Sequence, residues 1–128
     1  MIEIKGIEKT TLSIEEAKRA IEAANTIASE MNYKIPEYLV VIFVEEKLYE
    51  KTKNTSPDYI EVEEGILVYN GSSIIIRCDY LSIKLLEKLL LGLLIAFYYN
   101  TFMDYGIELS KKILKDRFFS ITGPFYRS

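Results

Sequence analysis

The chain has 128 residues, of which 49% are hydrophobic, and we expect a single domain over 1–128 with its own core. The absence of histidine and the single cysteine exclude histidine-dependent catalysis, an internal disulfide and the usual zinc motifs. A net charge of −3 gives no reason to expect a nucleic-acid-binding surface.

Two features of the sequence predict the cellular compartment of the protein and the kind of organism it comes from. The N-terminus is charged from Glu3 onward and does not resemble a secretory signal peptide, so we expect an intracellular, cytoplasmic protein. Ile, Lys and Glu are abundant while Gln and Trp are absent, which is typical of hyperthermophile proteins. We therefore expect a hyperthermophilic archaeal source, or a virus or plasmid of such a host.

The first half of the chain alternates between predicted strands and helices. Over 1–9 the apolar residues Ile2, Ile4 and Ile7 stand between charged ones, which predicts a short strand and is compatible with an edge position. Ser13 and Glu16 form a capping box that begins an amphipathic helix over 14–32. The run 38–44 is almost entirely β-branched, aromatic or Leu, as in a strand buried on both faces. The polar segment 45–54 predicts either a short helix or a loop.

The segment 59–76 predicts a meander of strands. Asn70 and Gly71 stand between two strand-like runs, 66–69 and 73–76. Asn-Gly in this position is the strongest short signal for a hairpin, because both turn residues need a positive φ. Another short strand, beginning near Tyr59, precedes this hairpin.

The stretch 82–104 is the one around which the other elements must pack. Its middle, 89–99, carries no charge, so the predicted helix is apolar on all sides. A membrane span needs about 20 apolar residues, so we expect a buried central helix and no span. A C-terminal amphipathic helix over 107–118 follows, and then an aromatic tail, 119–128, which Gly123-Pro124 should keep irregular.

The order of these elements, strands followed by helices, favours an α+β fold. We expect a mostly antiparallel sheet that contains the Asn-Gly hairpin. The long central helix and the N-terminal and C-terminal helices should all pack on one side of this sheet.

The predicted layout of 38–104, a short sheet with a terminal hairpin followed by a helix, resembles that of minimal zinc peptidases, the zincins. In that family the helix carries the motif His-Glu-x-x-His. Leu91 and Ile95 stand where the two histidines would be, and Gly92 stands where the glutamate would be. The resemblance therefore implies a zincin-like scaffold without zinc and without the peptidase activity.

A group of carboxylates is the first candidate for chemistry: Glu45, Glu46, Glu61, Glu63 and Glu64. Alternation along a strand places Glu61 and Glu63 on one face, opposite Glu64. If Glu45 and Glu46 end the neighbouring strand, an acidic site of Glu45, Glu46, Glu61 and Glu63 could bind Mg²⁺ or supply an acid of raised pKa. A charged, solvated edge explains the same residues.

Two further sets of residues have both a chemical and a structural explanation. Cys78 lies beside Arg77 and just before the central helix, where the pKa of a thiol can be lowered, but no histidine is present to activate it. A cationic cluster could contact nucleic acid or form the solvated face of the last helix, and it consists of Lys111, Lys112, Lys115 and Arg117.

Aromatic residues are concentrated toward the C-terminus, and Tyr is favoured at protein interfaces. Simple core packing would account for some of them. The residues that we assign to an interface are Tyr98, Phe102, Tyr105, Phe118, Phe119, Phe125 and Tyr126.

The sequence thus predicts a non-catalytic interaction or structural protein that has no cofactor and forms a homodimer or binds an unknown protein partner. One alternative is a carboxylate-dependent enzyme, with or without Mg²⁺. The second alternative is a nucleic-acid accessory factor.

Overall fold

The computed structural model describes the backbone of residues 1–126 and the side chains of 1–117. The elements are β1 (Ile2–Lys5), a 3-10 turn (Ile7–Lys9), α1 (Ile14–Glu30), β2 (Leu39–Val44), α2 (Glu46–Thr55), β3 (Ile60–Glu63), β4 (Ile66–Tyr69), β5 (Ser73–Arg77), α3 (Ser82–Phe102) and α4 (Ile107–Tyr126). This is an α+β fold, as predicted.

The five strands form one sheet in the order β1-β2-β5-β4-β3. β2 pairs in parallel with both β1 and β5, whereas the β5–β4 and β4–β3 pairs are antiparallel. The sheet is therefore mixed rather than mostly antiparallel. The physical reason is that α1 connects β1 to β2 as a crossover, which brings the second strand back in the same direction.

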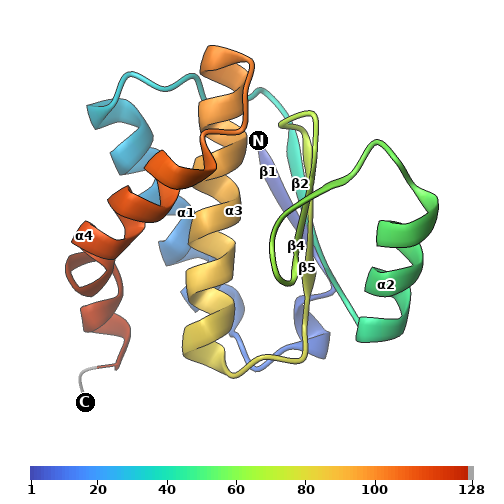
Figure 1. Ribbon diagram of the computed structural model, residues 1–128. Coiled ribbons are helices and arrows are strands. Elements are labelled where there is room, and N and C mark those ends of the chain that lie inside the picture. Colours follow the sequence, from blue (N-terminus) through green and yellow to red (C-terminus); the bar gives the residue numbers. More distant parts are fainter. Residues whose placement is uncertain (127–128) are drawn as a thin grey trace.

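The predicted N-terminal, central and C-terminal helices lie on one side of the sheet as expected, whereas the other side is covered by α2. α1 and α3 lie on one face with α4 packed against them, and α2 lies on the other face (Figure 1). α2 is needed there because β4 and β5 carry apolar residues on both sides. Leu67 and Ile75 form a second small core with Val44 and with Tyr49 of α2.

α3 is the centre of the main core, as its sequence predicts. Every residue from Lys88 to Phe97 is buried. Gly92 lets the helix approach the sheet closely, since a Cβ at this position would lie 3.1 Å from Cγ2 of Ile74. Among the described residues, no helix combines the length and the apolar character that crossing a membrane requires.

Two local predictions are confirmed in atomic detail. The Ser13 hydroxyl accepts a hydrogen bond from the Glu16 N–H at 3.1 Å, and the Ser13 N–H donates to the Glu16 carboxylate at 3.0 Å. In the hairpin turn, Asn70 and Gly71 have φ values of 51° and 68°. The Asn100 amide donates to the Gly71 carbonyl at 2.8 Å, which ties the end of α3 to this turn.

The last helix is longer than predicted. α4 continues past 118 to Tyr126 and includes Gly123 and Pro124, where irregular structure was expected. Gly123 lowers helix propensity without removing a hydrogen bond, and Pro124 lacks one backbone donor in the last turn of α4, so at most one hydrogen bond of the helix is lost. The side chains of Phe118, Phe119, Phe125 and Tyr126 lie outside the described residues.

Burial at and before α3 predicts how much stability is lost when each of two leucines is replaced by alanine. Leu89 has no exposed surface and Leu81, which precedes the helix, is 78% exposed. Leu89→Ala should lower the free energy of unfolding by about 2–5 kcal/mol, because it leaves a cavity in the core. Leu81→Ala should change it by less than about 0.5 kcal/mol. Urea titrations followed by circular dichroism would measure both, and equal effects would contradict the central position of α3.

Candidate functional site

The predicted acidic site does not assemble into a metal-binding group. Across the described residues, no three His, Cys, Asp or Glu side chains lie close enough together to hold a metal ion. Glu45 directly precedes α2 without a side-chain capping hydrogen bond, Glu46 begins that helix, and both are exposed. Glu61 and Glu63 lie on β3, where each is paired with cationic side chains.

Glu61 is held by two donors from α2. The Tyr49 hydroxyl donates to one carboxylate oxygen at 2.6 Å, and Lys53 lies 3.2 Å from the other. Burial works to raise the pKa of Glu61, but the hydrogen bonds from Tyr49 and Lys53 outweigh it and hold the pKa below its ordinary value. The arrangement favours an ionised carboxylate that anchors α2 to β3, and not an acid of raised pKa.

Glu63 connects β3 to two helices through Lys88 and Lys111. Its carboxylate lies 3.9 Å from the Lys88 ammonium of α3 and 3.6 Å from the Lys111 ammonium of α4. Lys88 is only 6% exposed, and it also donates to the Glu64 carbonyl at 2.6 Å. Burial lowers the pKa of Lys88. The nearby carboxylates of Glu63 and Glu64 oppose this shift but do not cancel it.

Arg77, at the end of β5, completes this network around the β3–β4 turn. Its guanidinium donates to Asp79 at 2.7 Å, to the Tyr80 hydroxyl at 2.6 Å and to Glu64 at 3.2 Å. The turn fits beneath Tyr80 only because residue 65 is glycine, since a Cβ there would lie 2.5 Å from the Tyr80 hydroxyl oxygen. The network therefore fixes the turn to β5 and α3.

Cys78 and the cationic cluster have environments that favour their structural explanations. Burial raises the pKa of the Cys78 thiol, although Arg77 and a helix start beside a cysteine can lower it, and this favours the structural explanation. In the cationic cluster, Lys111 pairs with Glu63 and Arg117 pairs with Glu30 of α1. Lys112 and Lys115 are exposed on α4.

The three positions that stand in for the zincin motif lie in the core. Leu91, Gly92 and Ile95 are all buried, and a Cβ at Gly92 would lie 3.1 Å from Ile74 and 3.6 Å from Ile66 of the sheet. They pack the helix against the sheet and other elements of the core. The zincin-like layout stays a hypothesis about ancestry.

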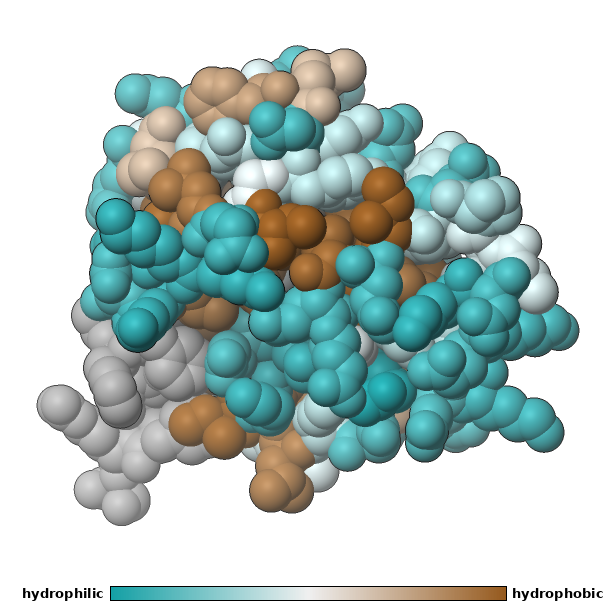
Figure 2. Space-filling model, in the orientation of Figure 1, coloured by the Kyte–Doolittle hydropathy of each residue, from teal (hydrophilic) through white to brown (hydrophobic). Residues whose placement is uncertain are grey.

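In the described part of the predicted aromatic interface, the rings are largely engaged in contacts within the chain. The Tyr98 ring lies 4.8 Å from the Phe102 ring and 5.6 Å from the Tyr33 ring, and Tyr99 stacks on Tyr105 at 4.8 Å. Phe102 is nevertheless 53% exposed. Hydrophobic residues on the face in Figure 2 are interrupted by hydrophilic ones.

The two edges of the sheet differ. β3, at one edge, has an irregular register between Glu61 and Glu63, and its carboxylates are engaged by lysines. Bulges and charges of this kind protect an edge from pairing with another strand. β1, at the other edge, pairs regularly with β2 through Ile2 to Lys5, and no other strand of residues 1–126 covers its outer side.

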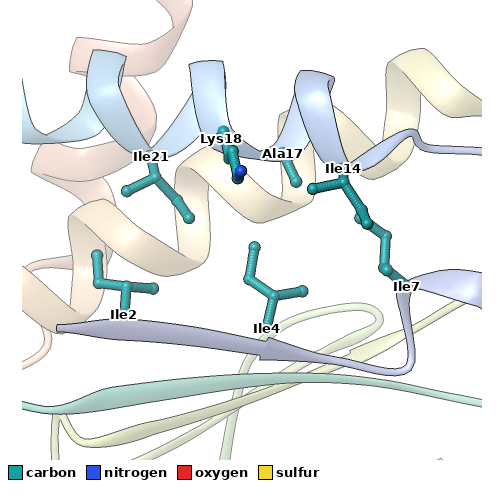
Figure 3. Close-up of a pocket in the computed structure, with 7 residues that line it drawn as sticks. All are labelled: Ile2, Ile4, Ile7, Ile14, Ala17, Lys18 and Ile21. Carbon is teal, nitrogen blue, oxygen red and sulfur yellow. The ribbon is translucent and has the colours of Figure 1, made fainter.

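An apolar groove of about 250 Å³ lies between β1 and α1 (Figure 3). Ile2 and Ile4 point into it from β1, and Ile14 and Ile21 face them from α1. The remaining lining residues are Ile7, Ala17 and Lys18. Ile14 is 61% exposed, so the groove is open along the side of the molecule. The free edge of β1 and this groove together form what we call the β1 surface.

Comparisons with protein families, curated protein sequences and solved structures found no match. The candidate site therefore depends on the geometry of this chain alone. Of the surfaces described, the β1 surface is the one that combines unpaired backbone with apolar side chains. The sequence indicated a short strand within 1–9, compatible with an edge, but it did not show that α1 would leave a groove beside it.

The anchoring of α2 gives a prediction with a defined pH dependence. Tyr49→Phe removes the hydroxyl that donates to Glu61, and a hydrogen bond to a charged group contributes about 1.5–3 kcal/mol. The pKa of Glu61 is lowered in the folded state, so its contribution is present above its ordinary pKa of 4.5 and is lost as pH falls through the folded value. The destabilisation should therefore be larger at about pH 7 than at about pH 3.

Tyr59→Phe is the matched control for this experiment. The Tyr59 hydroxyl lies 2.8 Å from Ser73 Oγ, a neutral partner, so its removal should cost about 0.5–1.5 kcal/mol at both pH values. Urea denaturation of both variants beside the wild type at each pH measures the difference. A Tyr49→Phe effect that does not change with pH would show that Glu61 is not held as described.

Proposed function

We propose that this chain is a non-catalytic interaction protein that self-associates, with the β1 surface as its contact region. The observation that carries the proposal is the open strand edge with an apolar groove directly beside it. An edge strand offers unpaired N–H and C=O groups to another chain. Ile2 and Ile4 on the strand and Ile14 and Ile21 on α1 would add apolar contact area.

The carboxylate-dependent enzyme is the weaker alternative. Glu61 and Glu63 are engaged by Lys53, Lys88 and Lys111, and Glu45 and Glu46 are exposed at the start of α2. Ion pairs of this kind favour a role in holding β3 to the helices. Nothing in the environment of these carboxylates favours a particular substrate.

The nucleic-acid accessory factor is also weaker. Lys111 and Arg117 are paired with Glu63 and Glu30, which leaves less positive charge for phosphate groups. The hyperthermophilic archaeal or viral source belongs to the proposal on composition alone, because Lys and Glu are abundant and Gln is absent.

The test is the solution mass of the full chain, measured by light scattering over a range of concentrations. We expect a dimer that Ile14→Glu shifts toward monomer, because a carboxylate would enter the apolar groove. Residue 14 opens α1, where an acidic side chain is compatible with the helix dipole, so the fold should be retained.

Leu48→Glu is the matched control, because Leu48 is 49% exposed in the first turn of α2 on the other face of the sheet. It should leave the dimer unchanged. A wild type that is monomeric at every concentration would contradict self-association. A dimer that resists Ile14→Glu and dissociates in a Phe125→Glu, Tyr126→Glu double variant would place the contact at the predicted aromatic interface instead.

A further inference from the structure

The backbone of β1 has a fixed orientation toward its open side. The Leu39 N–H donates to the Met1 carbonyl at 3.0 Å, and β1 and β2 pair in parallel with Ile2 beside Leu39. In a parallel ladder, alternate residues direct both backbone groups to the same neighbour. Met1, Glu3 and Lys5 therefore face β2, and the N–H and C=O groups of Ile2 and Ile4 point away from the sheet.

We infer that these groups pair with β1 of a second copy of this chain, antiparallel across a two-fold axis, with Ile4 opposite Ile4 of the second copy. This inference rests on the proposed self-association and adds its register. The result would be one continuous sheet across two copies, with the two grooves brought together along the axis.

The register follows from the direction of the backbone groups and from charge. Residues with outward-facing groups must stand opposite each other, so even-numbered residues face even-numbered ones. If Ile2 faced Ile4, Glu3 would face Glu3. If Ile4 faced Gly6, Lys5 would face Lys5. Like charges directly opposite each other destabilise a strand pair, so both of these registers are disfavoured.

With Ile4 opposite Ile4, the charges complement each other. Glu3 of each copy then faces Lys5 of the other. Within one copy the Glu3 carboxylate already lies 3.8 Å from the Lys5 ammonium, and both side chains are exposed. The two copies would join these ion pairs into a ring of four alternating charges on the face of the sheet opposite the groove.

The groove adds an apolar contact on the other face. Ile4 points into the groove beneath α1, so the two Ile4 side chains would meet at the axis (Figure 3). Ile14 and Ile21 of each α1 would lie beside this contact and lose exposed surface. Charged pairs on one face and apolar contact on the other are the features expected of a specific strand pair.

Charge reversal in the full chain tests the register. Glu3→Lys and Lys5→Glu should each weaken the dimer, by roughly tenfold in dissociation constant, because two attractive pairs become repulsive. The double variant, Glu3→Lys with Lys5→Glu, should restore an affinity within about threefold of the wild type, because it re-creates the ring with the charges exchanged. Tyr38→Phe controls for the hydrogen bond from Tyr38 to Glu3, which the reversal also removes.

Disulfide cross-linking of introduced cysteines tests the register directly. Cys78, the single native cysteine, is first replaced by alanine so that only the introduced thiol can react. Residues directly opposite in a hydrogen-bonded pair have Cα atoms about 5.5 Å apart, within reach of a disulfide. Ile4→Cys should therefore cross-link to itself under mild oxidation. Glu3→Cys and Lys5→Cys should not, because each would lie about 7 Å further along the strand from its counterpart.

The outcomes separate the two proposals. A chain that is monomeric throughout would overturn self-association and the register together. A dimer that cross-links best through position 3 or position 5, or whose double charge reversal fails to restore affinity, would overturn the register and leave self-association in place.

Discussion

The packing of α3 is the constraint on which the rest of the structure depends. A helix that is apolar on all sides has to be covered on all sides. The sheet covers one side, with Gly92 allowing a close approach to Ile74, and α1 and α4 cover much of the remainder. The small residues of α1, Ala17, Ala20, Ala24 and Ala28, are all buried, which lets this helix lie close to its neighbours.

This packing also buries a lysine among the leucines of α3. Lys88 is buried on α3, and its ammonium is satisfied by the Glu64 carbonyl, by Glu63 and by the Tyr80 ring at 4.5 Å. A buried charge is tolerated only when it is paired and hydrogen-bonded. The β3–β4 turn supplies these partners, so the polar network orients the same elements that the core brings together.

The two edges of the sheet differ in how far they are protected from pairing with another strand. This difference favours β1 as the contact region. Lysines from α2 and α4 engage the carboxylates of β3, and its register is irregular. β1 has a regular register and an apolar groove beside it. Because β1 is short, few of its residues can pair with another strand, which limits edge-to-edge aggregation. Glu3 and Lys5 would then select one register among the few that the backbone permits.

Local signals in the sequence determined the elements. The Ser13 capping box, the Asn70-Gly71 turn and the uncharged run at 89–99 each depend on neighbouring residues only, and each is found where it was predicted. The α+β class follows from the order of these elements, and it too could be predicted.

How separate segments of the chain meet depends on long-range packing, which no local pattern of residues encodes. Strand direction depends on crossovers, so the mixed sheet and the place of α2 on its second face were not predicted. The sequence left open whether the carboxylates at 61 and 63 converge with those at 45 and 46 or form a charged edge, and in the fold they are paired with lysines that come from three helices. The groove beside β1 likewise lies between two separate elements, with Ile2 and Ile4 on β1 and Ile14 and Ile21 on α1. No local pattern encodes it, because the position of α1 over the sheet depends on its packing against α3.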